Sequence, residues 1–380
     1  MTVENRVREI IACSNIDPRP YQTRIVTKVL QMFEGSYCNG AGELESAARS
    51  VMIESPTGSG KTCMGLLIAK VFQVQTGAKV GWVAMRRNLL HQVQAENRRH
   101  GINVELQTIS MFEKNPPSDI DLLVCDEGHH DGAASMAHLH NVIQSKWILG
   151  LTATPFRTDR VKLCFDKVVK DAGVQRLIQD GYLSQYDHYT VPKWDVLQLA
   201  DHFCSEPDRW GKSIFFFHTL GECFALNEIL QSRGIKSDVV TAGSDRDRQL
   251  ADFRNGGLQV LVNCMVLTEG FDDPTLQTVW VRPSAKGPTM QMAGRALRKC
   301  SGIAVKQVVQ CMQTPHPFPK TAMCRQQYLW QSGEWRSLRV NPKLKLCNFN
   351  TQRAIANTEV DLPKFLKREE GPRHRRIIRF

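Results

Sequence analysis

The sequence predicts an α/β protein made of two tandem units, each a parallel sheet flanked by helices, followed by a small basic extension. Three observations predict this architecture. Short apolar runs alternate with helical patterns twice along the chain, a glycine-rich loop follows the first run, and the composition becomes polar and basic after Gln313. Continuous apolar strands that alternate with helices are typical of doubly wound parallel sheets.

Length and composition agree with this class. The 380 residues are enough for two cores, and 42% hydrophobic with 23% charged residues is ordinary for a globular protein. We find neither an apolar run of about 20 residues nor an apolar leader, so we expect no membrane span and a cytoplasmic location, nucleoid-associated or in a viral host's cytoplasm. The 12 cysteines lack paired spacing, which indicates reduced thiols.

The charge distribution indicates a polyanionic partner. The formal net charge is +11, and the stretch from Arg325 to Phe380 carries 13 basic against 5 acidic residues. An excess of this kind favours nucleic acid but says nothing about fold. We expect the tail to be an auxiliary nucleic-acid contact or a solvated, flexible end. The spacing of Cys300, Cys311, His316, Cys324 and Cys347 does not match a zinc ribbon or finger.

The first unit is expected over residues 1–160. Two helical segments, one within 1–18 and one opened by Arg19, precede the first buried strand. The strands expected in this unit cover residues 51–53, 79–84, 104–108, 121–125 and 147–151. Helices are expected after the first two of them.

A connector over residues 161–190, with a helix at 175–183, leads to the second unit at 191–313. Its expected strands cover 213–217, 237–241, 258–262, 278–282 and 305–310, and a helix covers 221–233. This half has no second glycine loop, so it is expected to be a partner of the first unit. Residues 314–380 form the expected extension.

The segment Ser55–Thr62 reads Ser-Pro-Thr-Gly-Ser-Gly-Lys-Thr and lies between a strand and a helix. Backbone N–H groups of such a loop and of the helix N-terminus bind phosphate, and the glycines allow close approach. We therefore expect Lys61 to reach the β- and γ-phosphates of a nucleoside triphosphate and the Thr62 hydroxyl to bind Mg²⁺. The loop residues expected to contact the nucleotide are Thr57, Gly58, Ser59, Gly60, Lys61 and Thr62.

Two adjacent carboxylates, Asp126 and Glu127, end an apolar strand, at the sheet edge where ligands bind in open α/β folds. We expect Asp126 to hold Mg²⁺ and Glu127 to orient and deprotonate the attacking water. An acidic pair alone could cap a helix. The separation of Asp126 and Glu127 from Thr62 along the sequence, within one α/β unit, favours the catalytic interpretation.

An ordered set of motifs resembles the superfamily 2 helicases and translocases, P-loop NTPases with two RecA-like domains. The motifs are Arg19–Gln22, Ser55–Thr62, Asp126–His129, Leu151–Pro155, Thr268–Asp272 and Gln291–Arg298. Within that superfamily the motifs are most similar to the DNA-processing RadD, UvsW and XPB-type enzymes. The third residue of the DE-x-H box departs from that group, which has Ala or Cys where this chain has Gly128. The missing side chain carries no reacting group, so activity is still expected.

The resemblance implies ATP and Mg²⁺ as cofactors and assigns roles to residues of both domains. On the nucleotide, Tyr21 is expected to pack on adenine and Gln22 to read its edge. Arg295 and Arg298, three residues apart on one helix face, are expected to clamp the γ-phosphate as arginine fingers. Gln291 is implied as a further catalytic residue, Arg19, Gly270 and Asp272 as nucleotide contacts, and His129, Thr152 and Thr154 as coupling residues.

Short polar donors near strand ends are expected to hold nucleic-acid phosphates on another face. Each of them could instead cap a helix or turn. These residues are Arg86, Arg87, Gln92, Thr108, His218, Thr219, Thr241 and Thr268.

We therefore expect an ATP-dependent DNA helicase or translocase, a monomer on single-stranded, branched or duplex DNA that acts in replication, recombination or repair. Replication or repair proteins are possible partners. Three alternatives stay open: an RNA helicase or ribonucleoprotein remodeller, the motor subunit of a restriction or defence complex, and a non-enzymatic nucleic-acid binder. Leu-Thr-Ala-Thr-Pro at 151–155 and Gly-Phe-Asp at 270–272 favour DNA over RNA within the resemblance.

Overall fold

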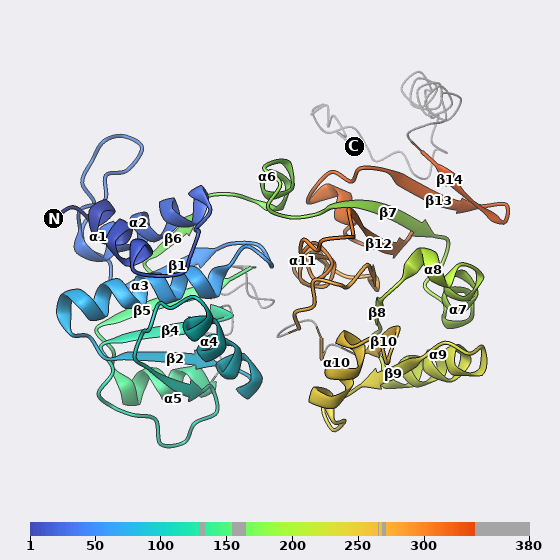
Figure 1. The fold of residues 1–380 in the computed structure, drawn as a ribbon, viewed down its shortest axis with the longest axis horizontal. Helices are drawn as coiled ribbons and strands as arrows, with labels where there is room; N and C mark the ends of the chain where they lie inside the picture. Colours follow the sequence, from blue (N-terminus) through green and yellow to red (C-terminus); the bar gives the residue numbers. More distant parts are fainter. Residues whose placement is uncertain (129–133, 154–164, 265, 268–270, 339–380) are drawn as a thin grey trace, which may run out of the picture.

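The computed structural model describes residues 1–128, 134–153, 165–264, 266–267 and 271–338. Two α/β bodies lie side by side and are joined through one short segment that contains helix α6 (Val174–Gln179) (Figure 1). None of the helices in these ranges is long and apolar enough to cross a membrane. The same residues contain no group of three His, Cys, Asp or Glu side chains that could hold a metal ion.

The first sheet is wholly parallel, with strand order β3-β2-β4-β5-β1-β6. Its central strands are buried over nearly their whole length, which explains their continuous apolar sequence. The strands are β1 (Ser50–Glu54), β2 (Val80–Ala84), β3 (Leu106–Ser110), β4 (Leu122–Asp126), β5 (Trp147–Thr152) and β6 (Lys167–Lys170). The helices are α1 (Val3–Ala12), α2 (Pro20–Glu34), α3 (Lys61–Thr76), α4 (Arg87–Arg99) and α5 (Ala134–Ile143).

The second sheet has the order β14-β13-β7-β12-β11-β8-β10-β9 and is parallel except for the β13–β14 pair. Its strands are β7 (Gln185–Val191), β8 (Ser213–Phe216), β9 (Ser237–Val240), β10 (Val260–Asn263), β11 (Thr278–Trp280), β12 (Val305–Cys311), β13 (Gln327–Gln331) and β14 (Glu334–Ser337). The helices are α7 (Val196–Ser205), α8 (Pro207–Trp210), α9 (Leu220–Ser232), α10 (Arg246–Arg254), α11 (Lys286–Gly294) and the 3₁₀ turn Phe318–Lys320. The predicted two-sheet α/β class is confirmed.

Four strands lie where the sequence analysis expected none. Within 161–190, β6 pairs with β1 of the first sheet and β7 pairs with β12 of the second. Within the expected extension, β13 adds to β7 and forms a hairpin with β14. The described part of the C-terminal region therefore continues the second sheet.

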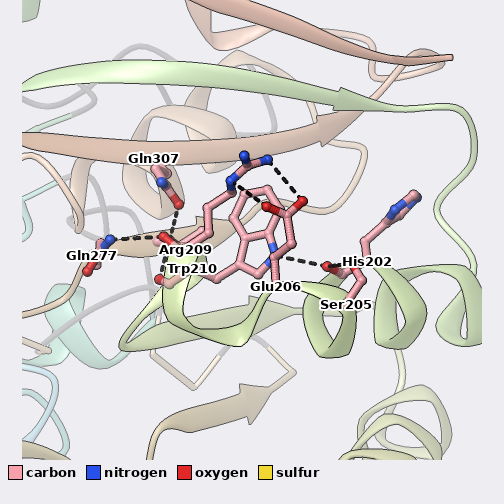
Figure 2. A network of polar contacts seen from close by, with 8 residues as sticks. His202, Ser205, Glu206, Arg209, Trp210, Gln277 and Gln307 are labelled. Carbon is pink, nitrogen blue, oxygen red and sulfur yellow. Dashed lines mark hydrogen bonds and ion pairs between the residues drawn. The ribbon is translucent and has the colours of Figure 1, made fainter. Parts of the chain in front are cut away.

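A polar network fastens α8 between α7 and the second sheet (Figure 2). The Trp210 indole N–H donates to the carbonyl of His202 at 2.8 Å, and the Thr278 hydroxyl contacts the carbonyl of Trp210 at 2.6 Å. The Gln277 side chain donates to the carbonyl of Arg209 at 2.9 Å. Trp210 is fully buried, so these bonds satisfy polar groups that lie away from water.

Candidate functional site

The glycine-rich loop has the backbone that phosphate binding requires. Gly58 and Gly60 have φ of 80° and 81°, in the left-handed region that favours glycine. A Cβ on Gly60 would overlap the Gln22 amide nitrogen, so a side chain at this position would displace Gln22 from the Ser59 carbonyl. The Lys61 ammonium donates to the carbonyls of Ser55 at 3.1 Å and Pro56 at 3.4 Å. Burial lowers the pKa of Lys61, while the carboxylates of Glu127 and Asp126 oppose that shift.

The two carboxylates lie at the end of β4. Burial, together with the neighbouring Glu127 carboxylate, raises the pKa of Asp126 to about 7. Glu127 has φ of 50°, a conformation that is uncommon for a side chain of this size and that marks local strain. Gly128, which follows, is closely covered: a Cβ there would lie 2.9 Å from Met52 Cε and 3.2 Å from Gly150 Cα. The Gly150 backbone, with Met52 beside it, leaves little space for a larger side chain at the third position of this box.

The second sheet's side of the site supplies two arginines. The Arg295 guanidinium donates to the carbonyl of Phe271 at 3.0 Å, and Arg298 forms an ion pair with Asp272. Burial lowers the pKa of Arg298 to about 10, so the side chain stays charged at neutral pH. Arg298 and Gly294 lie close to the glycine loop. A Cβ added to Gly58 would lie 3.2 Å from Arg298 Cγ, and one added to Gly294 would lie 3.2 Å from Thr57 Cβ.

These groups line one cavity of about 300 Å³ between the two bodies. The cavity wall combines basic side chains with a smaller number of carboxylates, which suits a polyanion that carries a cation. From the first body its lining includes Arg19, Thr57, Gly58, Gly60, Lys61, Thr62, Leu89, Gln92, Val93, Glu96, Asp126 and Glu127. From the connector and second body it includes Tyr182, Phe271, Asp272, Pro274, Arg295, Arg298 and Lys299.

The oxygen ligands in this cavity fit a hard divalent cation. The Thr62 hydroxyl, at the N-terminus of α3, and the Asp126 carboxylate line the same space as the loop amides. Carboxylate and hydroxyl oxygens with room for phosphate oxygens are what Mg²⁺ prefers. The left-handed glycines place the loop backbone against the same space. The residues present therefore fit a magnesium nucleotide.

A second groove, of about 450 Å³, also spans the two bodies. Arg86 and Arg87 reach it from beyond the carboxyl end of β2, and residues 244–247 reach it from the first turn of α10 and the two residues before it. Burial and the nearby Arg86 lower the pKa of Arg246 to about 10. Asp245 and Asp247 line the same groove and balance part of this charge. An anion such as a phosphate group would stabilise the guanidinium groups further.

Two family models match the chain and together cover both bodies. The model described as type III restriction enzyme, res subunit, matches residues 15–115 and 100–157. The model described as helicase conserved C-terminal domain matches residues 195–300. The chain belongs to the superfamily 2 helicases. Its two bodies are the RecA-like domains of that superfamily.

Relatives of this helicase are similar over part of their length. A 51.5 kDa protein of Lactococcus phage (isolate 7-9) is 31% identical over 268 residues, which cover 61% of this chain and 59% of that protein. The putative ATP-dependent helicase IRC3 of Saccharomyces cerevisiae is 26% identical over 231 residues, with coverage of 50% and 34%. The helicase thus spans less than two thirds of either relative.

A solved structure agrees with the fold. Dbp5 of S. cerevisiae, bound to RNA and ADP BeF3, superposes with a TM-score of 0.52 at 16% identity, over 78% of this chain and 88% of that one. At this identity the likeness shows the shared two-domain fold.

The two residues expected to contact adenine support the glycine loop. Tyr21 and Gln22 are buried, and both donate to the carbonyl of Ser59, at 2.6 Å and 2.8 Å. The Gln22 amide oxygen accepts from the backbone N–H of Arg19 at 2.9 Å and so caps α2. Neither side chain lines the cavity, whereas Arg19 does. Ser59 is likewise buried and contributes its carbonyl to this support of the loop.

Tyr182 is an aromatic group of the cavity that sequence reasoning missed. It follows α6 in the connector, packs on Tyr21 with ring centroids 5.5 Å apart, and lies 5.2 Å from the Arg19 guanidinium. Its place at the wall makes it, with Arg19, a further candidate to cover a nucleotide base. The one signal for Tyr182 in the sequence was that an aromatic residue directly follows Gly181, where the helix was expected to end.

Gln92 was expected among the nucleic-acid contacts, but it lines the nucleotide cavity from α4. The spacing of Leu89, Gln92, Val93 and Glu96 places these side chains on one helix face, and that face borders the cavity. Burial raises the pKa of Glu96, and Arg298 and Arg99 oppose that shift. The sequence signal that could have identified Glu96 was the helical spacing of Leu89, Gln92 and Val93, which continues to this carboxylate.

The other expected residues are dispersed. Gln291 is half-buried in α11 and is not among the residues that line the cavity. Thr152 is fully buried at the end of β5, where its carbonyl accepts from the backbone N–H of Ser55 at 2.9 Å. His129, Thr154, Thr268 and Gly270 lie outside the described residues.

Several expected nucleic-acid contacts have local hydrogen-bond partners. Thr108 is in the middle of β3, which ends at Ser110 and not at Thr108 as expected, because the strand continues beside β2 to Ala84. Thr219 caps α9 through a reciprocal pair with Glu222. The exposed His218 contacts Arg282 at 2.9 Å, and the Thr241 hydroxyl accepts from the backbone N–H of Gly243 at 3.2 Å.

Proposed function

We propose that this helicase is an ATP-dependent motor that moves along or unwinds DNA. The observation that carries the proposal is the single cavity in which Lys61, the Asp126–Glu127 pair and the Arg295–Arg298 pair meet. A site that needs residues from two bodies depends on their relative position, so its chemistry can be coupled to domain movement. The putative ATP-dependent helicase among its relatives supports the use of ATP.

The place of each side chain supports a role in the proposed reaction. Lys61 binds the β- and γ-phosphates when nucleotide displaces its contacts with the Ser55 and Pro56 carbonyls. Thr62 and Asp126 would hold Mg²⁺, which would offset the charge of the phosphate oxygens. Glu127 orients and deprotonates water, and Arg295 and Arg298 stabilise charge on the transferred phosphoryl group.

DNA is the substrate that we favour over RNA. The match to a restriction-enzyme subunit model supports it, and so do the motifs shared with DNA-processing superfamily members. RNA is the rival, because the solved relative Dbp5 is bound to RNA. In the groove that contains Arg86 and Arg87, we expect guanidinium groups to hold the sugar-phosphate backbone without reading bases.

A panel of nucleic acids tests the proposal. Steady-state ATP hydrolysis by the full chain is measured with single-stranded DNA, blunt duplex, forked DNA and single-stranded RNA at one fixed salt concentration. Stimulation of kcat by one or more DNA forms is expected. Stimulation by RNA alone would overturn the choice of DNA, and hydrolysis that no nucleic acid stimulates would overturn the motor proposal.

Replacing Arg87 by Ala is expected to weaken DNA binding about equally for every sequence. One lost phosphate contact reduces the slope of log Kd against log salt by about 1. Fluorescence anisotropy with labelled DNA over a salt series measures both effects. Arg248→Ala is the matched control, since Arg248 is exposed on α10 but does not line the groove. Equal salt slopes in wild type and Arg87→Ala would exclude the contact.

A further inference from the structure

Lys306 is a fully buried lysine on β12. Its ammonium group donates to the carbonyls of Pro274 and Leu276, both at 2.6 Å. Within the described part of the chain these carbonyls, rather than a carboxylate, accept from it. Burial lowers its pKa to about 8. Lysine is rarely enclosed in this way, because burial of an ammonium group is unfavourable, and the nearby Asp273 carboxylate offsets only part of that effect. The unfavourable burial of this ammonium group suggests that Lys306 has a specific role.

The carbonyls that Lys306 holds belong to the loop 271–276, which reaches the nucleotide cavity. Phe271, Asp272 and Pro274 all line that cavity. A second basic side chain also holds this loop: the Arg254 guanidinium donates to the carbonyl of Asp272 at 3.3 Å. Asp273 stabilises the turn through its contact with the Thr275 backbone N–H at 2.8 Å.

The same loop holds both candidate arginine fingers. The carbonyl of Phe271 accepts from Arg295, and the carboxylate of Asp272 pairs with Arg298. A shift of the loop therefore changes the position of both guanidinium groups. A displacement of about 1 Å at a reacting centre can reduce the rate by roughly a hundredfold.

We propose that Lys306 is a positioning residue for the phosphate site. By holding the carbonyls of Pro274 and Leu276, it fixes the loop that aims Arg295 and Arg298 at the nucleotide. This inference rests on the proposed function, because it assigns to Lys306 an effect on the hydrolysis step. It assigns no contact between Lys306 and nucleotide.

The test compares Lys306→Met with Val308→Ala in the full chain. Val308 is fully buried two residues along β12, on the same face of the strand, and its truncation lowers stability without removing a hydrogen bond to the loop. For Lys306→Met we expect kcat of DNA-stimulated hydrolysis to fall about 10- to 100-fold, with little change in KM for ATP. Val308→Ala is expected to keep kcat near wild type at a temperature below its own Tm.

A double-mutant cycle separates positioning from a general structural role. In the Arg298→Ala background, Lys306→Met is expected to lower kcat by a smaller factor than in wild type, because one of the groups that it positions is gone. If Lys306→Met lowers kcat by the same factor in the Arg298→Ala background as in wild type, the inference is overturned. Equal kcat losses in Lys306→Met and Val308→Ala would overturn it as well. If Lys306→Met does not fold, the same cycle is run with Lys306→Arg, whose larger head group displaces the two carbonyls. A wild-type kcat in that variant would contradict the inference.

The outcomes also distinguish this inference from the proposed function. Wild-type protein that shows no nucleic-acid-stimulated hydrolysis overturns the proposed function itself. Wild-type protein that hydrolyses ATP and loses activity in Arg295→Ala, while Lys306→Met keeps full kcat, overturns only the role of Lys306.

Discussion

Replacing Arg295 by Ala is expected to lower kcat for ATP hydrolysis by about 10³- to 10⁵-fold, the range measured for arginine fingers. Arg295 lines the cavity from the second domain, opposite the glycine loop. In the proposed role its charge would act on the phosphoryl group chiefly in the transition state, so KM and nucleotide affinity are expected to change far less than kcat. Single-turnover hydrolysis and the Kd of a fluorescent nucleotide measure the two effects separately.

Two further variants make this test specific. Arg295→Lys keeps the charge but loses the planar fork, so most of the kcat loss is expected to remain. Arg209→Ala removes an arginine of the same domain that pairs with Glu206 outside the cavity, and it is expected to retain full activity. A kcat close to wild type in Arg295→Lys would show that positive charge alone suffices and would contradict a finger role for Arg295.

Replacing Glu127 by Gln is expected to lower kcat by about 10²- to 10⁴-fold, since an amide cannot accept the proton of water. Nucleotide binding is expected to persist or to tighten. The Glu127 carboxylate is one reason why the pKa of Asp126 is raised, so its removal brings that pKa back toward the ordinary value. Asp126 is then ionised over a wider pH range and available to Mg²⁺. Hydrolysis and the Kd for magnesium nucleotide are measured on the same preparation.

The control for this variant is Glu43→Gln, an exposed glutamate far along the chain from the acidic pair, which is expected to leave kcat unchanged. Gln is close in shape to Glu, so the substitution leaves the steric demand of the left-handed backbone at position 127 nearly the same. A Glu127→Gln variant that hydrolyses ATP at the wild-type rate would exclude Glu127 as the base.

The central strands of both sheets could be predicted because burial on two faces leaves a continuous apolar signal. Strand β7 carried no such signal, although it is buried, because Asp187 and His188 interrupt it. Their polar groups are satisfied by Arg325 at 2.7 Å and by Gln310 at 3.1 Å, residues more than 100 positions away. Strand β6 was missed for another reason: it is a short edge strand whose Val168 remains half exposed.

The residues of the candidate site likewise fall into those that the sequence predicted and those that it did not. Lys61 and Asp126 could be assigned to one site from local motifs, because each follows a buried strand of the same sheet. Arg295 could be assigned only through the family resemblance, since its place in the cavity depends on contacts between the domains. Tyr182, Glu96 and Lys306 could not be placed, since each gains its role from contacts between segments that are distant in sequence. Gln22 shows a further limit. Its amide oxygen caps a helix and its amide nitrogen supports the glycine loop, and the motif alone does not reveal either contact.

The connector between β6 and β7 has a kinetic consequence. A fully extended chain covers roughly 3.5 Å per residue, so residues 171–184 could span about 50 Å at most. Whenever the domains separate, the arginines of one therefore stay within a small volume around the phosphate loop of the other. A short tether of this kind holds the effective concentration of its ends in about the millimolar range. Reassembly of the site is then a first-order event whose rate does not depend on how dilute the protein is.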